Sequence, residues 1–218
     1  MDILLISASP RKARSGTWAL AKHVVRGLGP QARVETVHLR DLKIGFCTHC
    51  EACHVACMRC PVKDDVHDLL EKILAADGII LAAPNYINQV PAALKAVLDR
   101  SSHFIHCKRL SGKYLCAVVT SGSGTKDGLI LDYLRHYANI CGAQFSGGVT
   151  ACARAVQKKA AEAVRFGARF SRDISQRRRY PAQIRAIRGA MAHFANIVGM
   201  RKDHWRGEYA YWKERGWL

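Results

Sequence analysis

Short apolar runs alternate with helical patterns along the first three quarters of the chain. Strands are expected at residues 2–7, 33–38, 78–83, 114–120 and 144–150. Helices are expected at residues 17–28, 64–76, 91–103, 129–141 and 154–175. Strands that are separated by helices pair in parallel, because each helix carries the chain back to the same edge of the sheet. The pattern predicts an α/β fold with a doubly wound five-stranded parallel sheet of order 2-1-3-4-5 and helices on both faces.

The last fifth of the chain does not follow this repeat. Three consecutive arginines, Arg177 to Arg179, and then Pro181 interrupt the pattern. A helix is expected at 184–198, followed by an aromatic tail. We therefore divide the chain into a domain at 1–176 and a basic, aromatic C-terminal helical extension at 177–218. The apolar stripe of helix 184–198 could lie on a membrane, but such stripes more often face a core or a second subunit.

Composition describes an ordinary globular protein. Hydrophobic residues make up 49% of the 218 residues and charged residues 23%, enough apolar side chains for a large core. No apolar run reaches the roughly 18 residues that a membrane span needs. Met1 and Asp2 lead directly into the first strand without the features of a signal peptide, so we expect a cytoplasmic protein with reduced cysteines.

The net charge of +17 is concentrated in the second half of the chain. Residues 1–100 contain 13 Lys and Arg against 10 Asp and Glu, whereas residues 101–218 contain 21 against 7. A basic face suits phosphorylated cofactors, acidic electron-transfer proteins or nucleic acid. The simpler alternative is a set of solvated helix surfaces.

The loop after the first strand has the chemistry of a phosphate site. It contains the hydroxyl groups of Ser9, Ser15 and Thr17 and the side chain of Arg11, and it opens a helix at Gly16. Helix N-termini present free N–H groups to anions. The loop has neither the P-loop ending nor the Gly-x-Gly-x-x-Gly of dinucleotide folds, and a polar loop with a capping Ser or Thr remains the alternative.

Two further loops follow the third and fourth strands. The first contains Pro84, Asn85, Tyr86 and Ile87, where Tyr86 offers a flat face and the backbone N–H groups can face a planar ring. The second contains Ser121, Gly122 and Gly124, whose glycines let the backbone approach a ligand closely. The carboxyl ends of parallel strands meet at one rim, so all three loops predict a shared site.

Five of the nine cysteines lie within Cys47-x2-Cys50-x2-Cys53-x3-Cys57-x2-Cys60. Thiols this close together in a loop are typical ligands of iron–sulfur clusters and zinc. Cys107, Cys116, Cys141 and Cys152 fall in or near regular elements and are expected to be packing residues.

Several motifs in register resemble a known family, the flavodoxin-like NAD(P)H-dependent FMN reductases, and within it the iron–sulfur flavoproteins. The resemblance covers about residues 1–150 and the ending of the chain. The motifs are Ser9-Pro-Arg, Ser15-Gly-Thr17, Cys60-Pro-Val-Lys-Asp-Asp65, Ala76-Asp-Gly-Ile-Ile, Pro84-Asn-Tyr86, Ala93-Leu-Lys-x3-Asp-Arg100 and Trp212-Lys-Glu-Arg-Gly-Trp217.

The resemblance implies bound FMN and a homodimer or homotetramer, with Asp99-Arg100 near a subunit interface. It assigns the phosphate to Ser9, Arg11, Ser15, Gly16 and Thr17. It assigns the isoalloxazine ring to Pro84, Asn85, Tyr86, Ile87 and to Ser121, Gly122 and Gly124. Ala8 departs from the family, which often has glycine there.

The resemblance also implies a 4Fe–4S cluster on the cysteine loop. Cys47, Cys50 and Cys53 match the first three ligands, and the fourth is either Cys57 or Cys60. We favour Cys60, because the residues after it match the family's run into the next helix. Zinc held with help from His49 or His54, a metal-free loop, and reversibly oxidised thiol pairs remain alternatives.

The sequence therefore predicts a flavin-dependent oxidoreductase. It would pass electrons between a reduced carrier, either a ferredoxin-like protein or NAD(P)H, and a small acceptor. No side chain stands out as a catalytic acid, base or nucleophile, and His103 and His106 are expected to be structural. One alternative is a cluster-free NAD(P)H-dependent FMN or quinone reductase. A basic nucleic-acid-binding protein is disfavoured, since no such motif is present.

Overall fold

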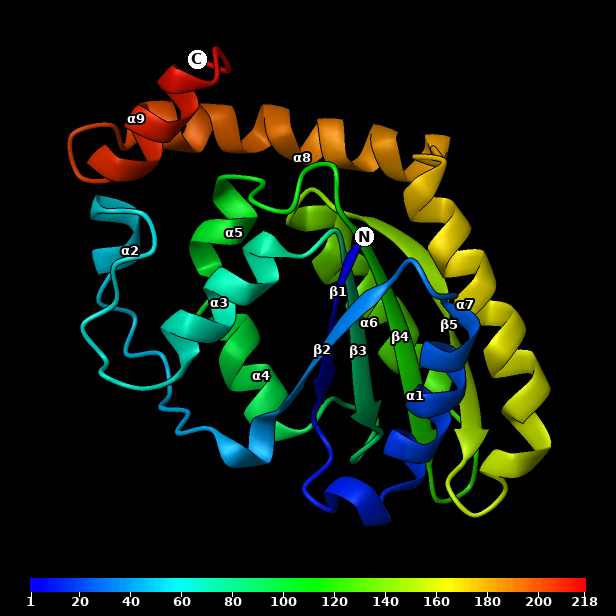
Figure 1. The fold of residues 1–218 in the computed structure, drawn as a ribbon. Helices are drawn as coiled ribbons and strands as arrows, with labels where there is room; N and C mark the ends of the chain where they lie inside the picture. The colour runs from blue at the N-terminus through cyan, green and yellow to red at the C-terminus, as the bar shows by residue number, and fades with distance from the viewer.

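A five-stranded parallel sheet forms the centre of the molecule in the computed structural model, which describes residues 1–218 (Figure 1). The strand order is β2-β1-β3-β4-β5, which confirms the predicted α/β class and order. The strands are β1 (Asp2–Ser7), β2 (Arg33–His38), β3 (Gly78–Pro84), β4 (Tyr114–Ser121) and β5 (Gln144–Cys152).

Helices cover both faces of the sheet. The α-helices are α1 (Gly16–Gly27), α2 (Ala52–Val55), α3 (Val66–Ala75), α4 (Ala92–Asp99), α5 (Ser102–His106), α6 (Asp127–Ile140), α7 (Ala160–Ser175), α8 (Pro181–Met200) and α9 (Arg206–Glu214). Short 3-10 helices are η1 (Lys12–Arg14), η2 (Leu39–Asp41) and η3 (Val156–Lys159). Helices α1 and α7 pack on one face, and α3, α4 and α6 on the other.

The alternation of side chains along each strand builds two cores. Leu4 and Ile6 of β1 enter one core, whereas Ile3 and Leu5 enter the other. Strands β3 and β4 are buried along nearly their whole length, because helices cover them on both sides. The rigid sheet therefore fixes the positions of the loops that follow β1, β3 and β4.

Several predicted helices have different bounds. The expected helix 91–103 is two helices, α4 and α5, because the chain bends at Arg100 and directs its side chain inward to Asp64. Asp64, expected to cap the next helix, lies one residue before the cap position, and its carboxylate accepts a hydrogen bond from the Val66 N–H at 3.2 Å while it also pairs with Arg100. The expected helix 154–175 begins as the 3-10 helix η3 before α7.

The C-terminal extension contains two helices rather than one. Helix α8 runs along one end of the domain, and α9, which the sequence did not predict, packs back toward α2 (Figure 1). A third apolar cluster fills the space beneath them, with Phe194, Val198, Trp205 and Trp212 buried. Trp205 and Trp212 thus dock onto the domain, and α8 faces this apolar cluster through Phe194 and Val198.

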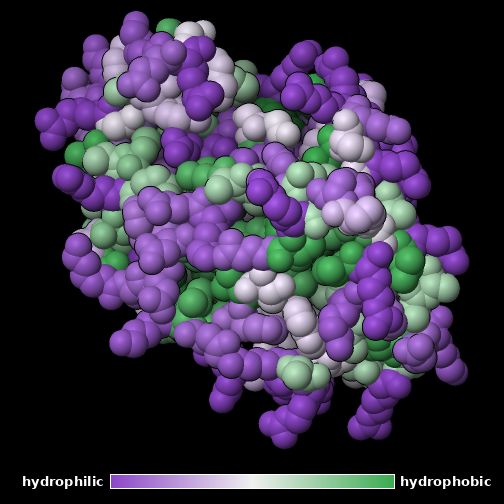
Figure 2. Space-filling view, in the orientation of Figure 1, coloured by the Kyte–Doolittle hydropathy of each residue, from purple (hydrophilic) through white to green (hydrophobic).

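The surface is dominated by hydrophilic side chains. They cover most of the face drawn in Figure 2, with smaller apolar patches among them. None of the helices combines the length and apolar character needed to cross a membrane.

Candidate functional site

A pocket of about 340 Å³ opens at the rim where β1, β3 and β4 end. This volume lies near the lower end of the range of about 300–1,000 Å³ for small-molecule sites. The pocket is lined by Ser9, Arg11, Arg14, Gly16, Thr17, Pro84, Asn85, Tyr86, Thr120, Ser121, Gly122, Ala153 and Arg154. The three predicted loops thus converge, as expected from the carboxyl ends of parallel strands.

The N-terminus of α1 forms one wall of the pocket. The Ser15 hydroxyl caps this helix by accepting a hydrogen bond from the Trp18 N–H at 3.4 Å. The Thr17 and Thr120 hydroxyl oxygens lie 2.6 Å apart and join α1 to β4. Free N–H groups at this helix end, with the Ser9 hydroxyl and the Arg11 and Arg14 guanidinium groups, suit a phosphate dianion.

The loop after β3 is a tight turn at the edge of the pocket. Tyr86 and Gln89 exchange two backbone hydrogen bonds of 2.9 and 3.0 Å. Ile87 and Asn88 between them have positive φ angles of 53° and 61°, which are rare for a β-branched residue such as Ile87. The Ile87 side chain is 98% exposed. Backbone strain of this kind clusters at ligand sites and persists only where the surrounding structure enforces it.

The loops after β3 and β4 are tied to helix α6 and to each other. The Asn85 amide donates to the Asp127 carboxylate at 3.0 Å, and the Asn85 N–H donates to the Thr120 carbonyl at 2.7 Å. The Ser121 hydroxyl accepts from the Gly124 N–H at 2.8 Å, where Gly124 has a φ of +75°. This backbone leaves an open, polar wall suited to the edge of a flat ring.

Most of the predicted cofactor residues line this pocket. Three do not: Ser15 acts as the helix cap, Ile87 points into solvent, and Gly124 supports the turn. The predicted set did not include Arg14, Thr120, Ala153 and Arg154, which also line the pocket. The position of Arg154 after β5 was an available signal, since this strand ends at the same rim.

The cysteine loop forms a second, separate pocket. Four of its five cysteines line that pocket, together with His49, His54 and Arg100. These cysteines are Cys47, Cys50, Cys53 and Cys60. All four are free thiols; Cys47 and Cys50 are exposed, and Cys53 and Cys60 are half-buried. Four thiols around one pocket are the donor set that a cubane cluster requires, so the residues fit such a group.

The protein environment tunes these thiols differently. Hydrogen bonds from the Ala52 N–H and the Thr48 hydroxyl lower the pKa of Cys50 from its ordinary value. Burial raises the pKa of Cys53, and the Ser102 hydroxyl, whose oxygen lies 3.6 Å from the Cys53 sulfur, only partly offsets it. Cys50 therefore ionises more readily than Cys53.

The fifth cysteine is directed elsewhere. Cys57 does not line the thiol pocket. It packs against the apolar cluster beneath α8 and α9, where its thiol forms a hydrogen bond with the thiol of Cys107. This hydrogen bond lowers the pKa of Cys57 and raises that of Cys107. Cys107, Cys116 and Cys141 are buried packing residues, as predicted, whereas Cys152 is half-buried and its thiol donates to the Gly122 carbonyl at 3.2 Å.

A buried ion pair supports the thiol pocket. The Arg100 guanidinium donates to both carboxylate oxygens of Asp64, at 2.7 and 3.1 Å, and to the Gly45 carbonyl at 3.1 Å. The side chains of Arg100 and Asp64 are only 2% and 6% exposed, and the Arg100 Nε has no partner. A guanidinium here places a positive charge beside Cys60. Arg100 is thus buried within its own chain, and only Asp99 of the Asp99-Arg100 pair is exposed.

The rim pocket coincides with the part of the chain that a known family covers. Residues 1–157 match the NADPH-dependent FMN reductases. The chain belongs to this family. Membership agrees with the predicted class of flavin-dependent oxidoreductase and with FMN as a cofactor. The donor set of the rim pocket suits a flat ring with a single phosphate.

Curated relatives bear out the finer resemblance. An iron-sulfur flavoprotein of Archaeoglobus fulgidus is 36% identical over 125 residues, which are 56% of this chain and 60% of that protein. An iron-sulfur flavoprotein of Methanosarcina thermophila is 33% identical over 128 residues, 59% of this chain and 66% of that protein. The matched region thus spans between about three fifths and two thirds of the length of these relatives.

The solved structures support the fold. The structure of RosB with a bound 8-demethyl-8-formylriboflavin-5'-phosphate intermediate has a TM-score of 0.67 to this chain. The alignment covers 88% of this chain and 87% of that one at 15% sequence identity. At this identity, the likeness establishes the α/β architecture and nothing more.

Proposed function

We propose that the protein is an FMN-dependent electron-transfer enzyme that takes electrons from a ferredoxin-like carrier or from NAD(P)H and delivers them to a small acceptor. The observation that carries the proposal is the rim pocket, in which a helix N-terminus, hydroxyl groups and arginines face a turn that presents Tyr86. When bound, FMN would supply the redox chemistry, because it accepts electrons singly or in pairs. The protein's own residues would bind it and orient it.

Each wall of the pocket has a part in this proposal. Ser9, Arg11 and Thr17, with the free N–H groups of α1, would hold the phosphate. Tyr86 and the backbone of Ser121 and Gly122 would border the ring and exclude water from it. No side chain of the pocket is assigned a proton-transfer role.

We further propose that Cys47, Cys50, Cys53 and Cys60 bind a 4Fe–4S cluster. The support is the convergence of these four thiols on one pocket, the direction of Cys57 away from it, and the names of the curated relatives. The positive charge of Arg100 next to Cys60 would partly offset the negative charge of a thiolate-bound cluster. A homo-oligomer, as the resemblance implied, remains part of this proposal.

A cluster-free reductase is the second candidate, since the family match does not require the cysteine loop to hold metal. Iron and acid-labile sulfide analysis of anaerobically purified protein separates the two candidates. We expect about four irons and four sulfides per chain, which is the content of one cubane. Zinc in place of iron, or no metal at all, would contradict the cluster proposal while leaving the flavin proposal intact.

The two candidate fourth ligands offer a matched pair of variants. Cys60→Ser should abolish iron binding, whereas Cys57→Ser should retain it, because only Cys60 lines the thiol pocket. Both variants should keep the flavin, since neither residue lines the rim pocket. Loss of iron from the Cys57 variant alone would show that our ligand assignment is wrong.

The choice between electron donors needs a kinetic comparison. Reduction of the flavin is followed anaerobically, with NADPH, NADH or a reduced ferredoxin as the donor. If the cluster mediates entry of electrons, Cys60→Ser should lose reduction by ferredoxin and keep any reduction by NADPH. If ferredoxin reduced the flavin of the unaltered chain and of the Cys60→Ser variant at equal rates, the cluster would be excluded from the electron-transfer path.

A further inference from the structure

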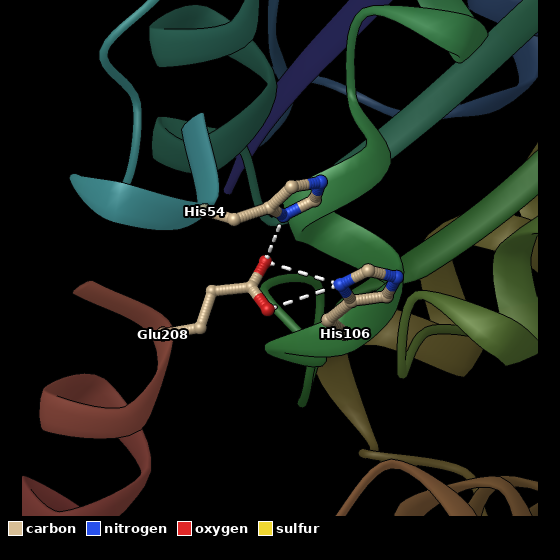
Figure 3. A group of neighbouring side chains, drawn as sticks. All are labelled: His54, His106 and Glu208. Atoms are coloured by element: carbon tan, nitrogen blue, oxygen red, sulfur yellow. Dashed lines mark hydrogen bonds and ion pairs between the residues drawn. The ribbon is translucent and has the colours of Figure 1, made fainter. Parts of the chain in front are cut away.

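Three side chains from distant parts of the chain meet in a buried group. None of them is among the proposed ligands of the cluster or of the flavin. Figure 3 shows His54 of α2, His106 of α5 and Glu208 of α9 directed toward one another. The Nδ1 atom of His54 lies 2.6 Å from one Glu208 carboxylate oxygen. The Nδ1 atom of His106 lies 3.2 and 3.0 Å from the two oxygens. All three potential ligand atoms lie within 4.8 Å of one another.

The charge of Glu208 has little compensation. Its side chain is 0% exposed, and its ion-pair partners are the two histidines, with no lysine or arginine among them. Burial opposes ionisation, but the hydrogen bonds from His106 and His54 outweigh it and keep the pKa of Glu208 below its ordinary value. A buried carboxylate of this kind requires a nearby positive charge.

The two imidazole rings lie against each other beside this carboxylate. The rings of His54 and His106 stack with centroids 4.8 Å apart, and Trp205 lies against both rings at 4.7 and 4.8 Å. A divalent cation between the two imidazole nitrogens and the carboxylate would supply a positive charge next to Glu208.

We propose that His54, His106 and Glu208 form a mononuclear site for a borderline divalent transition metal such as Zn²⁺ or Fe²⁺. Two imidazole nitrogens and one carboxylate are an established donor set for both ions. Zinc binds such ligands at about 2.0–2.2 Å, which separates neighbouring ligand atoms by roughly 3.3 Å. The present separations between nitrogen and carboxylate oxygen atoms are 2.6–3.2 Å, so a small outward movement of Glu208 would admit the ion.

The position of the site gives it a structural consequence. It would connect the cysteine loop, through α2, to α5 and to the C-terminal helix α9. His54 also borders the thiol pocket, next to Cys53 in sequence. A bound ion would therefore fix the loop that carries the thiols. The proposal requires neither FMN nor an iron–sulfur cluster, so it can fail independently of them.

Cobalt is a suitable probe, because thiolate and imidazole ligands give it different spectra. The full chain is stripped of metal anaerobically under reducing conditions and titrated with Co²⁺. We expect one Co²⁺ per chain that shows weak visible bands without the intense near-ultraviolet absorption of a thiolate complex. Elemental analysis of the dialysed protein gives the total Co²⁺ per chain. The intensity of the thiolate bands gives the share bound to cysteines, which is subtracted from this total.

Two ligand variants and one control complete the test. Glu208→Gln keeps the shape and hydrogen-bonding capacity of the side chain but removes its charge, and His106→Asn provides a second, independent variant. Each should weaken binding of this Co²⁺ by more than about 100-fold, since even outer-shell changes cost 10- to 100-fold. His136→Ala, an exposed histidine of α6, should bind Co²⁺ as the unaltered chain does.

The proposal fails on either of two results. Co²⁺ that binds to the unaltered chain only with thiolate bands would show that the histidine group holds no metal, whatever the variants do. Equal affinity and stoichiometry in the unaltered chain and in a folded Glu208 or His106 variant would show the same. Circular dichroism of each variant establishes that it is folded.

Discussion

At the scale of single residues, the Arg100–Asp64 pair is a buried ion pair whose loss should be measurable. It is buried, bidentate and adjacent to the thiol pocket. Replacing Arg100 by leucine would leave the Asp64 carboxylate buried without its partner, and we expect a loss of about 3–5 kcal/mol in the free energy of unfolding. Lys95→Gln is the control, because its pair with Asp99 is roughly half exposed and should contribute less than about 1 kcal/mol.

Urea denaturation of both variants measures these changes, and its pH dependence tests their cause. Burial opposes ionisation of Asp64, but hydrogen bonds from Arg100, Gly45 and Val66 lower its pKa below the ordinary 3.8. A lowered carboxyl pKa stabilises the fold above the ordinary value, and this stabilisation is lost as pH falls through the folded-state pKa. The difference between wild type and Arg100→Leu should therefore shrink below about pH 4. A difference that does not change with pH would argue against the ion pair as its source.

Lys108 offers a second residue-scale prediction. Its ammonium donates to the carbonyls of Ile105 and Ile140, both at 2.8 Å, and lies 4.2 Å from the centre of the Phe194 ring. Burial lowers the pKa of Lys108 from 10.5 to about 8. Between these values the unfolded chain binds more protons than the folded one, so stability should rise with pH by on the order of 2–3 kcal/mol.

Replacement by methionine isolates this contribution. Lys108→Met removes the titrating group. The free energy of unfolding of this variant should therefore stay nearly constant over the pH range in which that of the unaltered chain rises. Chemical denaturation at intervals from pH 7.5 to 10.5 gives both curves. Parallel curves for the two proteins would show that Lys108 keeps an ordinary pKa in the fold.

At the scale of elements, the crossing of α1 and α7 depends on the absence of side chains. A Cβ atom added at Gly167 of α7 would lie only 2.0 Å from the Val24 carbonyl oxygen of α1. Gly167→Ala should therefore push the helices apart and destabilise the fold by about 1–3 kcal/mol. Gly189→Ala on α8 meets nothing within 4 Å and should stabilise by about 0.5–1 kcal/mol.

Thermal unfolding of these two alanine variants compares the same chemical change in two helices. Opposite shifts in melting temperature are the expected result. If Gly167→Ala were as stable as the unaltered chain, α1 and α7 could separate without a loss in the free energy of unfolding. The close approach of Gly167 to Val24 would then not be required for stability.

The elements also show what the sequence could predict. Strand positions and order followed from apolar runs, because a buried parallel strand needs side chains that tolerate burial on both faces. The break between α4 and α5 could not be read in the same way, since it depends on Arg100 reaching Asp64, a contact between residues 36 apart. Helix α9 was missed because its tertiary contacts, Trp205 and Trp212 packing beneath α8, stabilise it more than any apolar repeat in its own sequence.

At the scale of the whole molecule, the two candidate sites occupy different parts of the fold. The rim pocket and the thiol pocket have no lining residue in common. The loop sequences predicted the first site because parallel topology brings strand ends together, and the cysteine spacing predicted most of the second. The His54–His106–Glu208 group was not predictable, because only the folded extension brings Glu208 to residues more than 100 positions away.

The binding of FMN to the rim pocket is the central claim, and a fluorescence titration of flavin-free protein tests it most directly. Free FMN is fluorescent, so binding at the rim is followed as quenching. We predict one FMN per chain, with Arg11→Ala weakening binding by at least about tenfold through loss of a charged phosphate contact. Lys22→Ala, which removes a basic residue of α1 outside the pocket, should bind as the unaltered chain does. A folded chain that takes up no FMN, or equal affinity in the Arg11 variant and the unaltered chain, would contradict the account.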